Sequence, residues 1–541
     1  MGETAGRSRL VYLCRSGFRG GSDMMSTRQT LELLRAYESR NVTFIETDGS
    51  WPIVWERAKG VHVWDAEGKK YLDLTAAFGV AATGHANKQV VAAGQRQMAR
   101  LLHAMGDVHP HALKARLARE LSRITFERWL DESKVQSPKS KVNGRCASAV
   151  TGKTIFCNSG FEAVEAALKT AMLATGKAGV IAFDGAYHGV GYGALNVTQR
   201  AHFRSPFRRQ LREFGHFVPF PKSGQAWRRS DPAGARTCLS AARRSGSRAK
   251  DDFGTGECLG VAADKNVRAP MPAGHSSPVA RELSDCSVAE ATALKAVESQ
   301  IRRLLRRERI GAILVEPIQV RGGINIPPLE FLPMLRRLCD EHEALLILDE
   351  IYTGFGRTGK WFACEHSGTV PDLICLGKAL TGGFPLSVCI GRADLMDAAW
   401  PPSSGEAIHT STFLGHPVGC AMALAQIKEI EAQKLVQRSA ELGGFLRSAL
   451  SHFRPRTSRL AWESRGLGLL AGVEIRLPDG SPATEAALQI VKVLLQRGFI
   501  LLPEGEHSNI IGFTPPLTVS QSQLLEAVNA CGEELHRCEV T

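Results

Sequence analysis

The stretch "LLILDEIYTGFGRTGK", residues 345–360, joins a short apolar run to the acidic pair Asp349–Glu350 and then to a glycine-rich turn. A continuous apolar run of this length, bounded by a turn, is typical of a strand buried in a parallel sheet. A carboxylate at the end of such a strand needs a partner, because an unpaired buried charge is costly. The stretch therefore predicts a buried strand that ends at an acidic residue, whose carboxylate pairs with another group.

Four further apolar runs resemble this one, and helical patterns separate several of them. The runs cover residues 154–157, 179–183, 312–317 and 373–377. The helical patterns cover residues 163–175, 331–342 and 417–432. Short buried strands that alternate with helices predict an α/β fold, in which helices flank a mostly parallel central sheet.

The glycines of the quoted stretch also match two nucleotide-binding patterns. Gly354, Gly356 and Gly359 spell GxGxxG, and residues 354–360 spell GxxxxGK, most of a phosphate-binding loop. A dinucleotide fingerprint has its acidic residue about 20 positions after the glycines, whereas here the acidic pair comes first. A phosphate-binding loop requires Ser or Thr after its lysine, but Trp361 stands there. We therefore interpret the glycines as a turn that leaves the strand.

The composition describes a large globular protein. The chain has 541 residues, of which 44% are hydrophobic and 22% charged, which suggests two or more domains or one large domain with a satellite. The net charge is +13, but the basic residues are dispersed and lack interleaved aromatic residues, so a charged surface is favoured over a nucleic-acid site. The 13 cysteines form no CxxC pair and no Cys/His ligand spacing. This usage indicates reduced cysteines and no metal site.

The location of the protein is predicted from two absences. No run of about 18 uncharged apolar residues is present, so no membrane association is expected. Residues 1–25 contain arginines but no apolar core for a secretion signal. Glu3 and the missing amphipathic pattern weaken the alternative of an organelle presequence. We therefore predict a cytoplasmic protein whose ordered chain starts near Ser26.

Pattern changes divide the chain into four segments. Residues 1–36 are expected to be a partly unordered tail and lead-in. Residues 37–85 contain an apolar–polar alternation over 54–74 that predicts a small antiparallel meander, the N-terminal part of a small domain. Residues 86–400 carry the strand–helix alternation of a large domain. Residues 401–541 add the C-terminal part of a smaller α+β domain.

Two segments interrupt the large domain. Residues 133–152 are polar and rich in Lys and Ser, and residues 222–289 are rich in Gly, Ala, Ser and Arg without periodicity. Both are predicted to be surface insertions or poorly ordered loops.

Lys378 follows the apolar run "LICLG" directly and precedes Gly382 and Gly383. One interpretation is a solvent-exposed lysine at a strand end. A desolvated lysine there would instead have a lowered pKa and act as an amine nucleophile toward an aldehyde.

Ser159 and Glu162 have the spacing of a capping box that opens a helix. The main-chain N–H groups of Gly160 and Phe161 would then face outward at the positive helix end, a natural seat for phosphate. Alone this is a well-capped helix. With Lys378 and Asp349, it predicts pyridoxal phosphate (PLP): lysine forms the imine, aspartate keeps the ring nitrogen protonated, and the helix holds the phosphate.

Seven motifs then resemble the class III (ω-amino acid) aminotransferases of PLP fold type I, which include the 4-aminobutyrate, acetylornithine and ornithine enzymes. They are "NSGFEAVEAALK", "FDGAYHG", "ILVEPIQ", "LLILDEIYTGFGRTG", "LGKALTGGFP", "STFLGHP" and "TPPLTVS". They occur in family order from about Tyr37 to the C-terminus, outside the two insertions.

The resemblance implies catalytic roles for Lys378, the Schiff-base lysine and proton shuttle, and for Asp349, the partner of the ring nitrogen. It implies that Tyr187 stacks on the ring and that Thr412 reaches the phosphate of a second subunit, so the site would belong to a homodimer. The remaining implied cofactor-binding residues are Ser159, Gly160, Phe161, His188, Glu316, Gln319 and Tyr352.

Two departures from the family concern the substrate. Gly512 stands where many members have an arginine for the α-carboxylate, and Arg321 stands where they have the glutamate that pairs with it. We hypothesise that Arg321 supplies the lost carboxylate contact, the alternative being a structural ion pair. The resemblance also assigns Phe78 to the substrate site.

The implied reaction is a ping-pong transamination. An ω-amino acid or amine, by default 4-aminobutyrate, would donate its amino group to a keto acid such as 2-oxoglutarate or pyruvate. An amino-acid racemase, an aminomutase or a decarboxylase is the alternative on the same scaffold. An inactive PLP-binding regulatory protein is a second alternative, disfavoured by the presence of both Lys378 and Asp349.

Overall fold

The structure is a computed structural model that describes residues 25–132, 151–223, 278–453 and 459–540. The chain forms two compact units, one from residues up to 58 with 63–71 and the other from residues 59–62 with 72–541. In the first unit, Ser26 caps helix α1 (Thr27–Tyr37) through a complete capping box. Helix α1 therefore begins directly after Ser26, and residues 1–24 lie outside the described residues, so the predicted tail stays a prediction. Three strands occupy the predicted meander, β1 (Trp55–Lys59), β2 (His62–Asp65) and β3 (Lys70–Asp73).

A seven-stranded sheet forms the centre of the second unit, in the order β4-β10-β9-β8-β7-β5-β6. Neighbouring strands from β9 to β6 are parallel, whereas β10 is antiparallel to both β9 and β4. The strands are β4 (Gly152–Cys157), β5 (Gly179–Phe183), β6 (Gly215–Val218), β7 (Ile310–Val315), β8 (Leu345–Asp349), β9 (Leu373–Leu376) and β10 (Ser387–Arg392). The predicted α/β fold with a mostly parallel sheet is confirmed.

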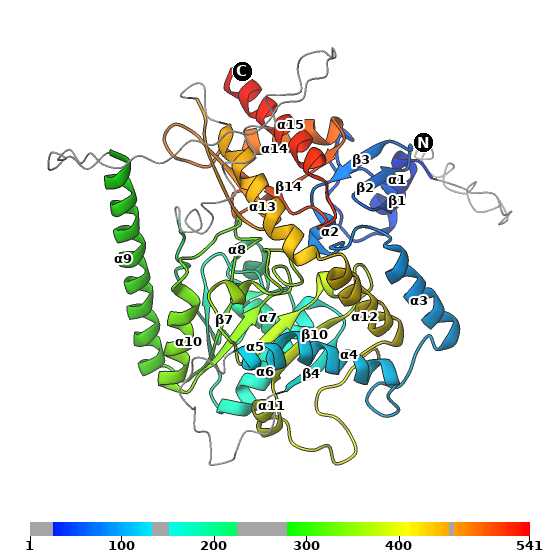
Figure 1. The fold of residues 1–541 in the computed structure, drawn as a ribbon, viewed down its shortest axis with the longest axis vertical. Coiled ribbons are helices and arrows are strands. Elements are labelled where there is room, and N and C mark those ends of the chain that lie inside the picture. Colours follow the sequence, from blue (N-terminus) through cyan, green and yellow to red (C-terminus); the bar gives the residue numbers. More distant parts are fainter. Residues whose placement is uncertain (1–24, 133–150, 224–277, 454–458, 541) are drawn as a thin grey trace, which may run out of the picture. The chain divides into compact units, whose positions relative to one another are not determined.

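Helices cover both faces of this sheet (Figure 1). Helix α6 (Gly160–Thr175) buries its alanine-rich face against alternate strand residues such as Ala182. Phe183 points to the other face, because successive strand side chains alternate, and its ring lies 5.3 Å from that of Phe331. Phe331 begins helix α10 (Phe331–His342), which packs beside the long helix α9 (Pro278–Arg307).

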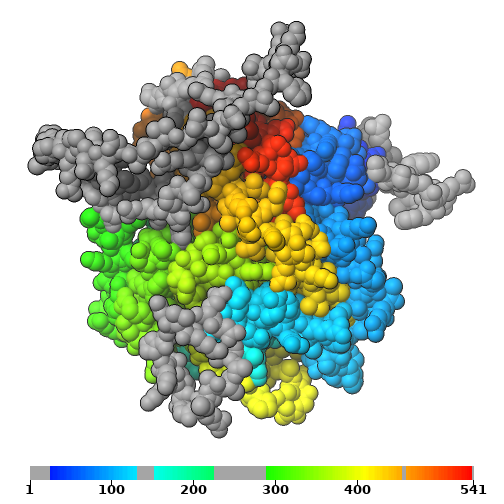
Figure 2. All heavy atoms as spheres, in the orientation of Figure 1, coloured from blue at the N-terminus to red at the C-terminus, as the bar shows by residue number. Residues whose placement is uncertain are grey.

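The C-terminal part of the chain builds a second, antiparallel sheet in the order β11-β12-β15-β14. Its strands are β11 (Ala461–Leu467), β12 (Leu470–Arg476), β14 (Leu502–Glu504) and β15 (Ile510–Phe513), and its helices are α13 (Leu435–His452), α14 (Thr484–Gln496) and α15 (Gln521–Val540). Strand β13 (Phe499–Ile500) pairs in parallel with Leu72 and Asp73. Figure 2 shows α12 (Pro417–Ala432) and α13 on the face between α15 and α4.

Shorter elements complete the second unit. They are α2 (Ala76–Gly79), α3 (Lys88–Arg100), α4 (Ala112–Ser122), the π-helix η1 (Arg123–Glu127), α5 (Arg128–Glu132), α7 (Tyr192–Val197), α8 (Ala201–Arg204), η3 (Ser205–Gln210), η5 (Ala363–His366), η6 (Lys378–Leu380) and α11 (Ala393–Ala399).

One sequence prediction is wrong in part. The sequence predicts an aperiodic insertion over residues 222–289, but the last residues of that segment, from Pro278, are the start of helix α9. The rest of that segment beyond residue 223, and residues 133–150, lie outside the described residues. The proposed domain boundaries stay a prediction. Within the described ranges, no helix combines the length and apolar character needed to cross a membrane.

Candidate active site

The carboxyl ends of β7, β8 and β9 bring acidic and basic side chains to one edge of the central sheet. Asp349 is the last residue of β8 and stands opposite Cys375 of β9. Glu316 follows β7, and Lys378 comes two residues after β9. Because parallel strands end at the same edge, three ionisable groups that lie far apart in sequence meet there.

Asp349 is buried, with 6% of its surface exposed, and has a histidine partner. His188 Nδ1 lies 2.8 Å from Asp349 Oδ2, a hydrogen-bond distance. The main-chain N–H of His188 donates to Thr198 Oγ1 at 2.9 Å, which holds the imidazole in place. Among the described residues, nothing bonds the buried Nε2 of His188. The other Asp349 oxygen accepts the N–H of Ile351 at 3.1 Å.

Lys378 opens the short turn η6 in a left-handed conformation, with φ 41°. Its Nζ lies 4.5 Å from the centroid of the Tyr352 ring. Burial lowers the pKa of Lys378, while the carboxylates of Asp349 and Glu316 oppose this shift. A lysine with a lowered pKa is a better amine nucleophile at neutral pH.

Glu316 connects this edge to the loop that carries Tyr187. Its carboxylate accepts the N–H of Tyr187 at 3.1 Å and that of Val320 at 3.4 Å. Burial raises the pKa of Glu316 to about 7, and the neighbouring Asp349 adds to the shift. Tyr187 is half-buried, and its ring centroid lies 5.1 Å from that of Phe203.

The N-terminus of α6 lies at the same edge. A Cβ at Gly160 would lie 3.1 Å from the Ile351 side chain, and a Cβ at Gly377 would lie 3.4 Å from it. The Ile351 side chain therefore packs between the start of α6 and the backbone that precedes Lys378. The first N–H groups of a helix have no intrahelical acceptor, so those of Gly160 and Phe161 are available to an anion.

The predicted capping box at this helix is wrong. Ser159 is the N-cap residue, but its side chain makes no capping bond. Glu162 instead accepts the main-chain N–H of Asn158 at 2.8 Å. Among the described residues, the buried Ser159 Oγ therefore has no hydrogen-bond partner. A buried hydroxyl without a partner at a helix N-terminus fits a phosphate group.

These groups match the demands of PLP: a lysine of lowered pKa, a carboxylate paired with histidine, and an open helix N-terminus with an unpaired hydroxyl. Lys378 would hold the cofactor covalently, Asp349 would face its ring nitrogen, and Ser159, Gly160 and Phe161 would hold its phosphate. The residues present therefore fit the predicted cofactor.

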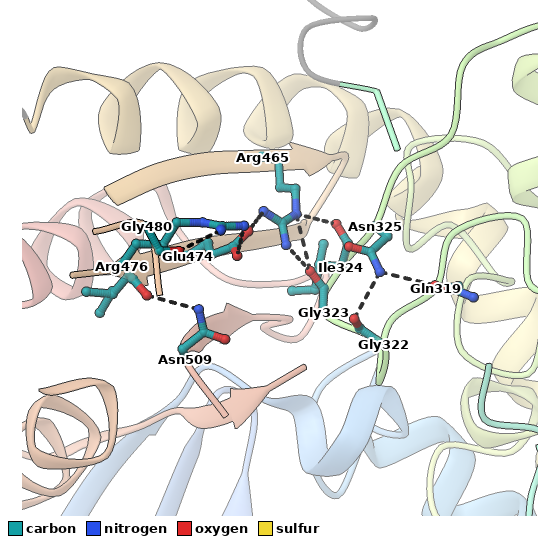
Figure 3. A network of polar contacts seen from close by, with 11 residues as sticks. Gln319, Gly322, Gly323, Ile324, Asn325, Arg465, Glu474, Arg476, Gly480 and Asn509 are labelled. Carbon is teal, nitrogen blue, oxygen red and sulfur yellow. Dashed lines mark hydrogen bonds and ion pairs between the residues drawn. The ribbon is translucent and has the colours of Figure 1, made fainter. Parts of the chain in front are cut away.

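Gln319 takes part in a polar network that fixes the loop after β7 (Figure 3). Its side chain donates to Asp184 O at 2.8 Å and accepts from Asn325 Nδ2 at 3.1 Å. Arg465 donates to the carbonyls of Gly323 and Ile324 and pairs with Glu474 at 2.6 Å. In this structure Gln319 braces the loop that carries Arg321.

Arg321 forms an ion pair with a residue that the sequence did not single out. Its Nη1 lies 3.2 Å from Glu504 Oε2, with 30% of the Arg321 side chain and 6% of the Glu504 side chain exposed. Burial raises the pKa of Glu504 to about 7, whereas Arg321 and Arg200 lower it. A Cβ at Gly512 would lie 3.2 Å from Glu504 Cγ, so the glutamate occupies space beside the glycine.

Tyr352 lies beside Lys378, whereas Phe78 is placed only by its neighbour Gly79, and its role in the site stays a prediction. The Tyr352 hydroxyl lies 3.3 Å from Thr514 Oγ1. Gly79, next to Phe78, packs against the Tyr352 ring, and Phe78 is 49% exposed. Sequence reasoning missed Thr514 and Glu504, because each has its partner more than 150 residues away.

Thr412 lies in an exposed stretch before α12. The neighbouring Thr410 hydrogen-bonds to Asp107, and Ser411 Oγ accepts from Asn158 Nδ2 at 3.4 Å. The described chain thus anchors both residues before Thr412 and leaves Thr412 itself at the surface.

Comparison with known families gives one extensive match. The family model described as "Aminotransferase class-III" matches residues 44–252 and 254–534. A 5-aminovalerate aminotransferase of Pseudomonas aeruginosa is 32% identical, over 90% of this chain and 94% of the relative. The 4-aminobutyrate aminotransferase of Escherichia coli K12 is 31% identical over 89% and 94%. A putrescine aminotransferase of Pectobacterium atrosepticum is 30% identical over 92% and 85%.

Solved structures share the fold. An ornithine aminotransferase from Toxoplasma gondii superposes with a TM-score of 0.69 at 23% identity, covering 95% of this chain and 96% of that one. An omega transaminase from Pseudomonas jessenii gives 0.70 at 22% identity, covering 93% and 97%.

Proposed function

Because the chain belongs to the class III aminotransferases, which depend on PLP, we propose that it moves an amino group from an ω-amino acid to a keto acid such as 2-oxoglutarate or pyruvate. The fold is PLP fold type I, in agreement with the sequence prediction. The observation that carries the proposal is the meeting of Lys378, the Asp349–His188 pair and the start of α6 at one sheet edge.

Each of these groups has a task in the reaction. When bound, PLP supplies an electron sink that makes a C–H bond beside the substrate nitrogen acidic. Lys378 Nζ takes and returns the proton, for which its lowered pKa suits it near neutral pH. Asp349 holds a proton on the ring nitrogen, and His188 fixes the orientation of its carboxylate. Tyr187, whose main chain is held by Glu316, would stack on one face of the ring.

The proposed donor is an ω-amino acid, with 4-aminobutyrate as the first candidate. Relatives at about 30% identity act on 5-aminovalerate, 4-aminobutyrate and putrescine, which differ in length and in their far-end charge. An arginine binds a carboxylate through charge-assisted, often bidentate hydrogen bonds. Arg321 is proposed to supply the contact to the keto-acid carboxylate that is lost at Gly512, and this carboxylate would have to displace Glu504 from Arg321.

A homodimer with a shared site is part of the proposal. Large apolar side chains are exposed together near the end of α3, and Phe413 beside Thr412 is exposed as well. Those of the α3 region are Met98, Leu101, Leu102, Met105 and Val108. Thr410 ties the two regions together through Asp107. An exposed apolar patch of this kind is typical of a subunit interface, which would bring Thr412 to a partner's phosphate site.

A cytoplasmic location is also proposed, supported by the cysteines. Eight cysteines whose side chains are described are free, and seven of these are buried. Reduced, buried cysteines are typical of a reducing compartment.

The test is an absorbance scan of the PLP-loaded protein against 4-aminobutyrate, 5-aminovalerate and putrescine, followed by product analysis with and without 2-oxoglutarate. We expect the donor to bleach the cofactor band and glutamate to form only with the acceptor present. Product that forms continuously without an acceptor would instead identify a racemase, aminomutase or decarboxylase.

A further inference from the structure

Residues 75–79 form a left-handed helical turn, which L-amino acids rarely adopt. The φ angles of Ala76, Ala77 and Phe78 are 46°, 49° and 61°, and that of Gly79 is 79°. The N–H of Gly79 donates to Thr75 O at 2.8 Å, which closes the turn. Each non-glycine residue in this conformation is strained. Three in succession persist only when surrounding contacts hold them.

Asp73 supplies those contacts. Its carboxylate is fully buried. One oxygen accepts the N–H and the hydroxyl of Thr75 at 2.8 and 2.6 Å. The other accepts the N–H of Ala77 at 3.2 Å and lies 2.7 Å from His85 Nε2. One side chain thus holds the start and the middle of the turn, and His85 holds that side chain.

The turn lies against the residues around Lys378. A Cβ at Gly79 would lie 2.8 Å from Tyr352 Cε1, and the Tyr352 ring faces Lys378 Nζ at 4.5 Å. Thr514 joins the two, because its Oγ1 donates to Thr75 O at 3.1 Å and lies 3.3 Å from the Tyr352 hydroxyl. A change in the turn would therefore move Tyr352.

We propose that Asp73 is a positioning residue: with His85 it holds residues 75–79 in the left-handed turn, which fixes Tyr352 beside Lys378 and presents Phe78 to the amino donor. The effect on the donor rests on the proposed function, whereas the effect on the turn does not. Asp73 itself is not placed in contact with substrate.

A glycine rescue tests the proposal. Asp73→Asn should lower the Tm and raise the donor KM about 10- to 100-fold, because small misplacements near the reacting groups are costly. Adding Ala77→Gly should restore both, since glycine adopts positive φ without strain. The matched control is Ala81→Gly in the same background, because Ala81 lies just after the turn and has no positive φ; it should restore neither.

Two further measurements keep the result interpretable. The Tm is measured without donor, so it tests the role of Asp73 in the turn independently of activity. If the wild-type protein uses no donor in the panel, that result counts against the proposed function and not against the role of Asp73 in the turn. If Asp73→Asn does not fold, His85→Asn replaces it in the test. Adding Ala77→Gly to His85→Asn should also restore the Tm and the donor KM. An unchanged donor KM in both variants, or equal effects of the two glycines, would overturn the proposal.

Discussion

Arg321 and Glu504 form an ion pair of 3.2 Å at the place where Gly512 leaves room for a glutamate side chain. The two residues come from the loop after β7 and from β14. The proposed binding of a substrate carboxylate by Arg321 requires that Glu504 gives up this ion pair. Protonation of Glu504 would release it, and burial places the pKa of Glu504 at about 7. The proposed role of Arg321 therefore couples carboxylate binding to the protonation of Glu504.

The first prediction is a pH-dependent KM for the keto acid. The raised pKa means that Glu504 is mostly neutral below about pH 7 and ionised above it. The KM for 2-oxoglutarate should therefore rise several-fold between about pH 6 and pH 8. Glu504→Gln should give a low KM with little pH dependence.

The matched control for this prediction is Glu506→Gln, because Glu506 is exposed and two residues away. It should keep the wild-type profile. A Glu504→Gln variant whose KM rises with pH as steeply as that of the wild type would contradict the coupling.

The second prediction concerns Arg321 itself. Arg321→Ala should raise the KM for the keto acid about 10- to 100-fold, the value of a charge-assisted contact. It should also lower the Tm at about pH 8, because it leaves the ionised Glu504 buried without its partner. Arg321→Ala combined with Glu504→Gln should recover the Tm but not the KM. An unchanged KM for the keto acid in Arg321→Ala would mean that the Arg321–Glu504 ion pair is only structural and that Arg321 does not bind the substrate.

Patterns local in sequence predicted five of the seven strands of the central sheet, because burial on both faces leaves a continuous apolar run within one segment. Strands β6 and β10 were not predicted. Asp349 followed from the same logic, as a carboxylate at the end of such a run. Its contact with His188 was not predicted. The two residues are 161 positions apart, and neither has a sequence signal that points to the other.

Other features depend on contacts that no local pattern encodes. Residues 76–78 contain no glycine, so nothing in "AAF" indicates a left-handed turn. The conformation depends on a carboxylate three residues earlier and a histidine twelve positions from it. At Ser159 the local pattern was misleading, since the N–H of Asn158 occupies the glutamate that a capping box would use.

The third prediction separates cofactor binding from folding at Ser159. Its hydroxyl has no partner among the described residues, so Ser159→Ala should leave the Tm of the cofactor-free protein unchanged. PLP should bind about 10-fold more weakly or worse, the cost of one hydrogen bond to a charged group. Thr154→Val is the matched control, because Thr154 also has a buried unpaired hydroxyl but lies on β4. Equal PLP affinities for the two variants would remove Ser159 from the site.

The fourth prediction tests the shared site by complementation. Lys378→Ala should be inactive, with kcat reduced by at least about 10²-fold, because it removes both the covalent contact and the proton carrier. Thr412→Asp should weaken PLP binding by placing a negative charge near the phosphate. In a mixed dimer, one site would combine the Lys378 of one chain with the Thr412 of the other.

Purified mixed dimers, selected with two different tags, should therefore recover about half of the wild-type activity per dimer, since one of two symmetric sites is intact. The control mixes Lys378→Ala with Asp349→Asn. Both of these residues lie at the same sheet edge of one chain, so each site of that mixed dimer keeps a defect and no activity should return. No recovery in the Thr412 mixture would place Thr412 outside the partner's site, and recovery in the control would show that Lys378 and Asp349 do not serve the same site.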